Sequence, residues 1–557
     1  MSILNTSKVT INHRIELWVV LTICILSIIL SATLSGLCFK FSCIERDTAS
    51  YLFQAKLFAH GRLFAEPPPE YGFTASPHVN INNGKWYSKY QFGNALMLTP
   101  GVLVDAPWLT PAILTGLTLV FLYLIVREIY DKRIAMLAMI LGCISPATLI
   151  MGATWFSENV SRFYLSIYLF ALIKMLKNGR WFYAALSGFA LGYAFNTRPY
   201  QAFVFGLAGA GLTLYFIVRS HDRGMVLKKI LVFLIPLSML IGLFMAWNNY
   251  FTGNPLKPTF NFMQPYDKIG FGKRSEGYEP DPKKIPAYTM NEGIRKKWLY
   301  ALPCVSSNTL GWGYYAFVHM PGFSLPIKNS KFSNPIYIWI LALLLLLPFI
   351  LMLIPIFHSS RNRYDIFFLT LFLLIVLFLL FEYFDPSGSD FSALCARYYS
   401  ECILLGIIPL LARGIGIFYE WIKGFRSLRL LVLLGVVSSL LSINTIYSYV
   451  CYIRLCRSDC RNIYRDLPKL IEKQKVHHAV VFIPNGIDAP MGDYPFQSLN
   501  DVDVVYFKLG PSKTWKLTNT DWRKVYMQYF QGRHIYIIHK LGNNFVLQNP
   551  QLKISKP

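Results

Sequence analysis

The chain has 557 residues, of which 54% are hydrophobic and only 15% are charged, well below the quarter or so that is usual in soluble domains. The apolar residues fall into long separate blocks, as transmembrane helices of about 20 residues require. The net charge of +25 would suit nucleic-acid binding, but most Lys and Arg lie in short loops between the blocks, where basic residues set membrane topology. Composition and charge placement therefore exclude a soluble protein and argue against a nucleic-acid partner.

Eleven apolar segments predict transmembrane helices, so we expect an all-α, multi-pass membrane domain. The first block, from Ile15, is longer than the apolar region of a signal peptide and has no A-x-A cleavage site, so we expect it to remain as a helix. The approximate spans are residues 15–38, 108–127, 134–153, 157–174, 181–196, 200–219, 229–248, 335–357, 364–382, 397–420 and 429–451.

The short connections between these spans alternate in charge, and this alternation predicts the orientation. The poorly charged set holds only Arg198 and Arg397, with Arg162 one turn inside the fourth span. Because basic loops stay in the cytoplasm, we expect a cytoplasmic N-terminus and an extracytoplasmic C-terminus. The basic connections carry Arg127, Lys132, Arg133, Lys174, Lys177, Arg180, Arg219, Arg223, Lys228, Lys229, Arg361, Arg363, Lys423, Arg426 and Arg429.

Two long loops lie on the predicted outer side, at about residues 40–107 and 249–334. The second is rich in Gly, Pro and Tyr, and a loop of this length is usually functional. The first contains a helix-like stretch that starts at Asp47. Apolar residues repeat there at helical spacing, as in a helix lying along the membrane interface: Leu52, Ala55, Ala59 and Leu63, with Phe58 beside them.

After Arg461 the composition becomes that of a globular domain. Apolar runs at residues 479–482, 502–507 and 534–538 predict strands with helical stretches between them. We therefore divide the chain into a transmembrane domain, residues 1–460, and a small α/β extracytoplasmic domain, residues 461–557.

The ten cysteines show neither a CxxC pair nor the Cys/His spacing of a metal site. Cys24 and Cys143 lie inside spans and are expected to pack as apolar groups. Cys456 and Cys460 follow the last span, where they could pair in an oxidising compartment.

Polar residues at the predicted outer ends of the spans are the candidates for function, because ionisable groups in membrane segments are usually functional. Carboxylates and several cations on one face suit an anionic substrate handled by a carboxylate base. These residues are Asp47 after the first span, Glu158 at the start of the fourth, Arg198 at the start of the sixth, Arg397 and Glu401 at the start of the tenth, and Lys85 and Lys89 in the first outer loop.

Each acidic candidate also has a purely structural interpretation. Asp47 could cap the N-terminus of a helix. Glu158 could be a first-turn acid favoured by the helix dipole, or could pair with Arg162 four residues later. Glu401 could pair in the same way with Arg397, four residues before it.

The basic candidates have similar alternatives. Arg198 and Arg397 could anchor their helices at the membrane interface, and Lys85 and Lys89 could simply be solvated. The occurrence of all these groups on one face favours a functional site.

Several stretches, taken in order, resemble the GT-C glycosyltransferases. This superfamily includes protein O-mannosyltransferases, lipid A aminoarabinose transferases and rhizobial core galacturonosyltransferases, and the α/β tail fits it as well. Many relatives have Asp-Glu where this chain has Asp47-Thr48, and often Asp or His where Glu158 stands. The matching stretches are Asp47 to Lys56, Gly61-Arg62-Leu63, Lys85 to Gly93, Arg198-Pro199, Tyr250 to Pro255, Gly270-Phe271-Gly272 and Arg397-Tyr398-Tyr399.

The resemblance implies a polyprenyl-phosphate-sugar-dependent glycosyltransferase of the cell inner (plasma) membrane. Such an enzyme moves a hexose or pentose from the lipid-linked donor to a hydroxyl of a glycan, lipid or protein acceptor. The reaction takes place at the extracytoplasmic face, with inversion at the anomeric carbon, and the lipid tail of the donor lies among membrane lipids.

The resemblance also implies roles for the candidates. Asp47 would be the general base, with Glu158 as the second catalytic carboxylate, and the cations would stabilise charge on the leaving phosphate. The substrate-binding residues would be Lys85, Lys89, Arg198, Arg397, Glu401, Tyr51 and Tyr87.

No cofactor is required for this chemistry, because lysines and arginines can neutralise a phosphate diester. A divalent metal held by Glu45 and Asp47 is a less favoured alternative.

Two other functions stay open. A transporter or lipid-linked glycan flippase would place charges midway in its spans and often show internal repeats, and a non-catalytic assembly protein would bind through its tail.

Overall fold

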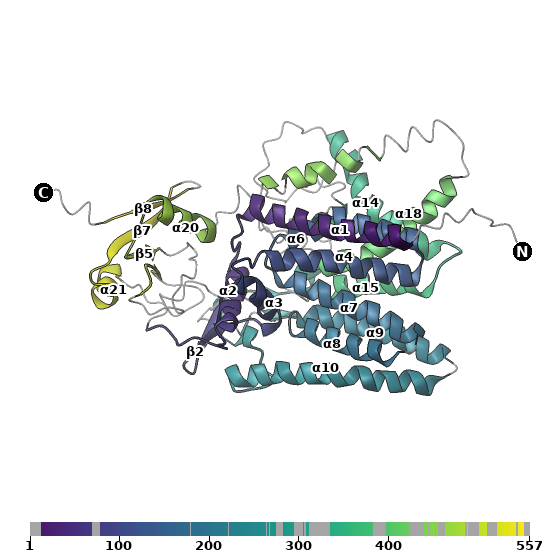
Figure 1. The fold of residues 1–557 in the computed structure, drawn as a ribbon, viewed down its shortest axis with the longest axis horizontal. Coiled ribbons are helices and arrows are strands. Elements are labelled where there is room, and N and C mark those ends of the chain that lie inside the picture. Colours follow the sequence, from purple (N-terminus) through teal and green to yellow (C-terminus); the bar gives the residue numbers. More distant parts are fainter. Residues whose placement is uncertain are drawn as a thin grey trace, which may run out of the picture.

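The computed structural model shows a bundle of long helices with a small α/β unit beyond one end of it (Figure 1). The structure describes residues 13–69, 78–178, 180–220, 222–262, 265–266, 268–274, 282–294, 305, 308–310, 335–381, 397–423, 438–439, 441–443, 445–451, 453–454, 463–484, 487, 501–509, 521–541 and 544–550.

The bundle helices coincide with the predicted spans, except that residues 429–437, 440 and 444 of span 429–451 fall outside the described residues. Within the described part, six helices are long and apolar enough to cross a membrane, or seven if one bent pair is a single span. The helices are α1 His13–Leu34, continued by the π-helical η1 Ser35–Phe39, α4 Leu109–Ile129, α5 Lys132–Ile144, α6 Pro146–Gly152, α7 Ser157–Asn178, α8 Trp181–Phe195, α9 Pro199–Arg219, α10 Arg223–Thr252, α14 Pro335–Phe357 and α15 Arg363–Leu379. The tenth predicted span consists of η6 Arg397–Tyr399, α17 Ser400–Cys402, η7 Ile403–Ile407 and α18 Ile408–Ile422.

The third predicted span is broken in two. Asp131 caps α5 by accepting hydrogen bonds from the backbone N–H groups of Arg133 (2.7 Å) and Ile134 (3.0 Å). Pro146 cannot continue a helix hydrogen-bond ladder, so α5 ends at Ile144 and α6 leaves at an angle of 57°. The break places the start of α6 beside α7.

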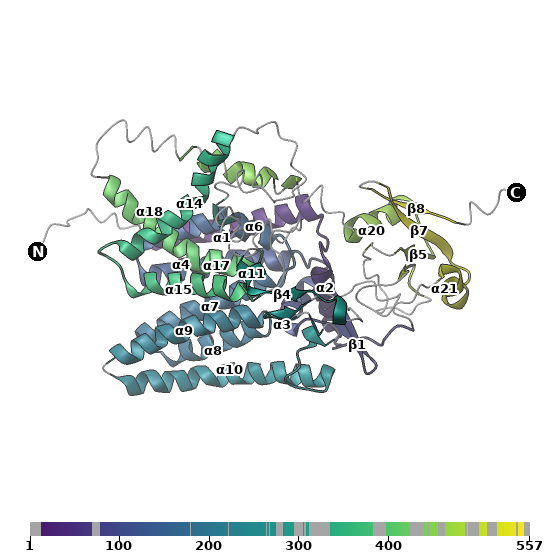
Figure 2. The ribbon, with the colours of Figure 1, turned by 180° about the vertical axis from the view of Figure 1, so that it is seen from behind.

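The two ends of the bundle differ in character. At the end where the N-terminus lies, the buried carboxylate of Glu16 in α1 pairs with Lys132 (2.6 Å) and Arg127 (3.1 Å). At the opposite end lie α2, α3 and the α/β unit (Figure 2). The basic connections α4–α5, α7–α8 and α9–α10 gather at the first end, and its location in the cytoplasm stays a prediction.

The first outer loop forms α2 Arg46–Ala59, a hairpin of β1 Val79–Asn82 with β2 Lys85–Ser88, and α3 Phe92–Leu103. The predicted helix is confirmed, but the predicted apolar stripe does not describe its buried residues, and its position at the membrane interface stays a prediction. The helix ends before Leu63, which is 47% exposed, whereas Phe53 and Leu57, off the stripe, are buried. Since α3 and the hairpin both pack against α2, the helix is buried on more than one side.

The second outer loop contributes short elements: η3 Thr259–Asn261, β3 Gly272–Lys273, η4 Pro282–Lys284, β4 Ala287–Tyr288 and α11 Met290–Gly293. Strands β3 and β4 pair antiparallel. The Gly270 backbone N–H donates to the Phe381 carbonyl (2.8 Å) and the Tyr288 hydroxyl to the Leu380 carbonyl (3.0 Å). This hairpin is thereby fixed at the end of α15.

The tail forms a four-stranded sheet in the order β6-β5-β7-β8, with β5, β6 and β7 parallel and β8 antiparallel to β7. One face of β5 packs on Ile463 and Leu467 of α20, and the other on Val525 of α21. Its elements are α20 Ile463–Lys473, β5 Ala479–Ile483, β6 Val504–Lys508, α21 Trp522–Tyr529, β7 His534–Leu541 and β8 Asn544–Gln548. Cys456 and Cys460 lie outside the described residues.

Candidate active site

Asp47 lies in the first turn of α2, at the end of the bundle next to the α/β unit. Glu45, not Asp47, is the N-cap residue of this helix, and the Thr48 hydroxyl accepts from the Glu45 backbone N–H (3.1 Å). The N-cap interpretation of Asp47 is therefore wrong, and its side chain makes tertiary contacts instead.

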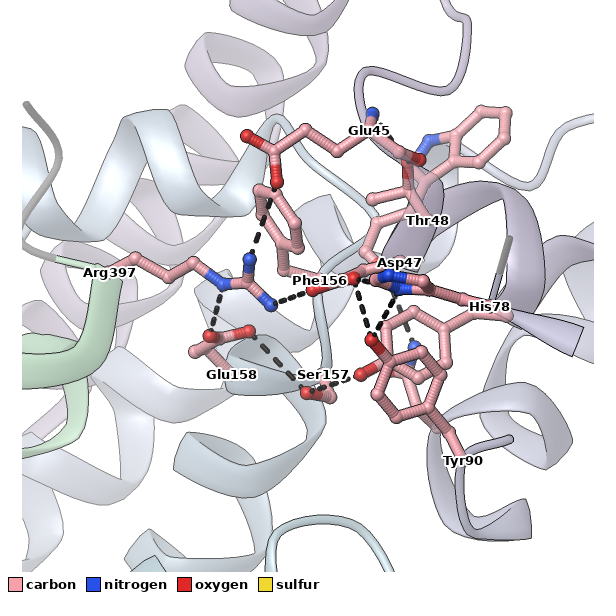
Figure 3. Close-up of polar contacts among 12 residues, drawn as sticks. Glu45, Asp47, Thr48, His78, Tyr90, Phe156, Ser157, Glu158 and Arg397 are labelled. Atoms are coloured by element: carbon pink, nitrogen blue, oxygen red, sulfur yellow. Dashed lines mark hydrogen bonds and ion pairs between the residues drawn. The ribbon is translucent and has the colours of Figure 1, made fainter. Parts of the chain in front are cut away.

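The Asp47 carboxylate accepts hydrogen bonds from three other parts of the chain (Figure 3). His78 Nδ1 lies 2.6 Å from Oδ1, and the Tyr90 hydroxyl donates to the same oxygen at 2.6 Å. Arg397 Nη2 donates to Oδ2 at 2.7 Å. A carboxylate has about four lone-pair positions, so these contacts leave one position, on Oδ2.

The protonation state of Asp47 follows from these partners. Burial alone would raise its pKa, but the positive charge of Arg397, the hydrogen bond from His78 and the charge of Lys89 hold the pKa of Asp47 well below its usual range. Burial and the Asp47 charge raise the pKa of the Tyr90 hydroxyl well above its usual value. Asp47 is thus an ionised proton acceptor, and Tyr90 stays a donor.

Glu158, in the first turn of α7, lies fully buried next to Asp47 and is held by two arginines. Its Oε1 accepts from Arg397 Nε at 2.5 Å and from Arg198 Nη1 at 2.6 Å. The expected pair with Arg162 is not the one formed, because Arg162 donates to the Ala147 carbonyl (3.0 Å) at the start of α6. Glu158 therefore joins the two arginines.

Arg397 connects the acidic groups of the site. Besides its bonds to Asp47 and Glu158, its guanidinium lies 3.5 Å from Glu45 Oε2 and 3.7 Å from the centroid of the Phe156 ring. Its side chain is only 5% exposed, so it does not serve as an interface anchor. The guanidinium stands between Glu45 and Asp47, the two carboxylates considered as metal ligands.

Glu401 also has a different partner from the one expected. Its Oε1 lies 3.3 Å from Arg198 Nε rather than beside Arg397. The π-helical η7 begins two residues after Glu401, and η1 ends eight residues before Asp47. Such short π-helical segments often occur at functional sites, where they change the direction of the side chains beside them.

A close backbone approach brings Arg198 to the site. The Gly93 N–H at the start of α3 donates to the Asn196 carbonyl (3.1 Å), and a Cβ on Gly93 would lie 2.7 Å from that oxygen. Only glycine fits there without a shift. Arg198 follows as the N-cap residue of α9, with a side chain that is 11% exposed and aimed at the acids.

Lys89 and Tyr51 complete the cluster. Lys89 is buried, with its ammonium 4.5 Å from the Phe260 ring centroid, and it is close enough to lower the pKa of both Asp47 and His78. The Tyr51 hydroxyl donates to Ser157 Oγ (3.1 Å), which lies 3.5 Å from Glu158 Oε2.

Lys85 and Tyr87 are not brought into this cluster. Residues alternate along β2, so Trp86 and Ser88 face α2 while Lys85 and Tyr87 face the end of α10. Lys85 Nζ donates to the Tyr250 carbonyl (2.9 Å) and lies 3.5 Å from the Tyr250 ring centroid. At about 3.3 Å per residue, the backbone of Lys85 is roughly 13 Å from that of Lys89.

Sequence reasoning missed His78 and Tyr90. Asn83-Gly84 between two short stretches that each contain two apolar residues is a hairpin signal, and both residues have positive φ, 48° and 70°. The resulting register pairs Val79 with Ser88 and continues with a bond from the Lys89 N–H to the His78 carbonyl (3.1 Å). A hairpin predicted from Asn83-Gly84, with this register, would have placed His78 next to Lys89.

Within the part of the chain that the structure describes, no group of three or more His, Cys, Asp or Glu side chains is arranged to hold a metal ion. Arg397 already supplies a positive charge between Glu45 and Asp47.

Comparisons with known proteins bear on the fold of the chain. A family model described as dolichyl-phosphate-mannose-protein mannosyltransferase matches residues 96–247. No curated protein matches the chain. The crystal structure of ArnT from Cupriavidus metallidurans bound to undecaprenyl phosphate is similar, with a TM-score of 0.55, 12% identity, and coverage of 94% of this chain and 92% of ArnT.

The apo structure of the same ArnT gives a TM-score of 0.51 at 13% identity, with the same 94% and 92% coverage. A weaker likeness, with a TM-score of 0.47 at 12% identity, is to the oligosaccharyltransferase AglB from Archaeoglobus fulgidus, covering 98% of this chain and 75% of AglB. The chain is thus a mostly helical, multi-pass membrane protein that shares its fold with ArnT. The family model matches residues 96–247 of the chain, and the likeness to ArnT shows a shared fold.

Proposed function

We propose that the protein transfers a sugar from a polyprenyl-phosphate donor to an acceptor hydroxyl at the extracytoplasmic membrane face, with inversion. The observation that carries this proposal is the Asp47 carboxylate, held by three donors and left with one lone-pair position beside Arg397. The similar ArnT structure holds undecaprenyl phosphate, which supports a lipid phosphate as the leaving group.

The reaction is a single displacement. The acceptor oxygen attacks the anomeric carbon from the side opposite the phosphate, and the bond from that carbon to the phosphate oxygen breaks. The polyprenyl phosphate leaves with the electron pair, and the acceptor proton passes to Asp47 Oδ2. A positioned base of this kind contributes about 10²–10⁴-fold to the rate.

The leaving phosphate is received by Lys89, Arg198 and Arg397. A guanidinium carries five N–H donors, and the contacts of Arg397 with Glu158, Asp47 and Glu45 use three of them. The remaining donors can take phosphate oxygens as charge grows on the leaving group. Lys85 and Tyr87 are left out because their contacts lie at the end of α10.

Glu158 and Glu401 position these arginines. Glu158 bonds to both guanidinium groups and Glu401 lies beside Arg198. Together with Glu45 and Asp47, they give the site four carboxylates. The site also holds four basic side chains: Arg162, Arg198, Arg397 and Lys89. Because arginines and Lys89 supply the positive charge, we propose that the transfer needs no metal.

The test uses the purified protein in lipid nanodiscs with a panel of undecaprenyl-phosphate hexoses and pentoses and an envelope extract as acceptor. Mass spectrometry should detect free undecaprenyl phosphate and a glycosylated acceptor for at least one donor. A flippase would move the donor across the membrane intact, so donor movement without release of undecaprenyl phosphate would refute the proposal.

A further inference from the structure

We infer that His78 is a positioning residue that holds the Asp47 carboxylate open toward the acceptor. This inference rests on the proposed function, because it assigns to His78 a task in the proton transfer to Asp47. The two residues meet from different elements, Asp47 from the first turn of α2 and His78 from the residue before β1.

The geometry fixes which ring nitrogen carries the hydrogen. His78 Nδ1 lies 2.6 Å from Asp47 Oδ1 and 2.9 Å from the Tyr90 hydroxyl oxygen. Two lone pairs would repel each other at 2.6 Å, so Nδ1 must carry a hydrogen that it donates to Asp47. In the neutral ring the lone pair then sits on Nε2.

His78 is held in place by the helix that carries Asp47. The Ser50 hydroxyl, on the next turn of α2, donates to the His78 carbonyl, and the same hydroxyl contacts Ser88 Oγ at 2.7 Å. The Lys89 N–H also donates to the His78 carbonyl (3.1 Å). With a side chain only 7% exposed, His78 has a fixed orientation toward Asp47.

The consequence concerns Arg397. A guanidinium and a carboxylate readily form a bidentate pair with two parallel hydrogen bonds. Such a pair would turn the Asp47 carboxylate toward the guanidinium and would add a second charge-assisted hydrogen bond to its ionised form, which makes Asp47 a poorer base. Donation from His78 and Tyr90 keeps Oδ1 turned away, so Arg397 bonds only to Oδ2.

His78 also makes this arrangement sensitive to pH. The charged groups that face it are Asp47 and Arg46 from α2 and Lys89 after β2, with Tyr90 as the titratable neighbour and Arg397 acting through Asp47. Burial, and then the charge of Lys89, lower the pKa of His78, so the ring is neutral at neutral pH. Protonation at lower pH adds a positive charge beside Asp47 and makes the carboxylate a poorer base.

The experiment compares His78→Ala, His78→Asn and the control His60→Asn with wild type. The Asn side-chain amide can replace the Nδ1 donor, whereas Ala cannot. His60 is an exposed histidine at the end of α2. Turnover is measured with the donor that the panel identifies, and binding is measured separately with undecaprenyl phosphate.

We expect His78→Ala to lower kcat by roughly 10-fold or more, since misplaced catalytic groups can cost about 10²-fold. His78→Asn should recover most of that loss, and its kcat should stay constant into the acid range where wild-type kcat falls. Both variants should bind undecaprenyl phosphate as wild type does, and His60→Asn should match wild type throughout.

Full turnover by His78→Ala would overturn the inference and leave the proposed function standing. A His78→Asn protein that binds undecaprenyl phosphate but is as slow as His78→Ala would show that the ring itself takes the proton, which also overturns it. If His78→Ala does not fold, the inference is tested by His78→Asn alone. A kcat of His78→Asn that falls at acid pH as the wild-type kcat does would refute the inference. Failure of wild type to release undecaprenyl phosphate from any donor bears on the proposed function alone.

Discussion

Replacing Asp47 with Asn removes one negative charge and almost no volume, so it separates proton transfer from packing. In one amide orientation the Asn oxygen still accepts from His78 and Tyr90, as Oδ1 does in wild type. The amide nitrogen then faces Arg397 Nη2, and two donors meet where a 2.7 Å ion pair stood. Arg397 keeps its bond to Glu158 (2.5 Å) and stays in the site.

The two losses should appear in different measurements. A hydrogen bond to a charged group contributes about 1.5–3 kcal/mol, and the lost Arg397 contact should lower the free energy of unfolding by up to that amount. The lost base should lower kcat by about 10²–10⁴-fold, which is roughly 2.7–5.4 kcal/mol of activation free energy. Binding of undecaprenyl phosphate should not weaken, because Lys89, Arg198 and Arg397 remain.

Glu45→Gln is the matched control. Glu45 also faces Arg397, at 3.5 Å, so the control removes a neighbouring negative charge without touching the proposed base. Transfer rates, thermal unfolding and undecaprenyl phosphate binding are compared for the two variants. Turnover by Asp47→Asn within a few-fold of wild type would refute the assignment, and strong loss in Glu45→Gln alone would move the base to Glu45.

Two further predictions follow from the same geometry, and a third follows from the charges of the short loops. Glu158→Gln should weaken undecaprenyl phosphate binding and slow turnover less than Asp47→Asn does, because Glu158 holds Arg198 and Arg397 without taking the proton; a larger loss of turnover would contradict this role. Lys89→Ala should raise KM for the donor at least several-fold, since charge-assisted hydrogen bonds are roughly twice as strong as neutral ones; Lys85→Ala is its matched control, and equal effects of the two would contradict the placement. A reporter active only outside the cytoplasm should be active when fused after Pro557; activity of a cytoplasm-only reporter there would reverse the orientation.

The membrane helices were predictable because every backbone polar group in lipid must be paired within a helix, which requires long apolar runs that are visible in the sequence. The outer loop was less predictable. An apolar stripe predicts one buried helix face, but α2 packs against both α3 and the hairpin, so Phe53 and Leu57 are buried off the stripe. In the hairpin, Lys85 begins β2 and contacts the end of α10, whereas Lys89 follows the last residue of the strand, so the length of β2 separates two lysines that look equivalent in the sequence.

The contacts that define the site could not be derived from local pattern. Arg397 bonds to Asp47 across 350 residues and to Glu158 across 239. The nearby partners suggested by helical spacing, Arg162 for Glu158 and Arg397 for Glu401, were wrong. A buried carboxylate takes whichever cation the packed helices bring to it, and that choice depends on bends and π-turns that hydropathy does not report.

The shared guanidinium of Arg397 links donor binding to proton transfer. In the structure, Arg397 is the largest of the positive influences that keep the pKa of Asp47 low, so Asp47 is a weak base. A lipid phosphate that draws on the same guanidinium competes with Asp47 for its positive charge, and the negative phosphate itself also disfavours an ionised carboxylate. Both effects raise the pKa of Asp47 toward the range in which a general base works best. On the proposed function, Asp47 therefore becomes an effective base when the donor is bound, and its ion pair with Arg397 restrains it until then.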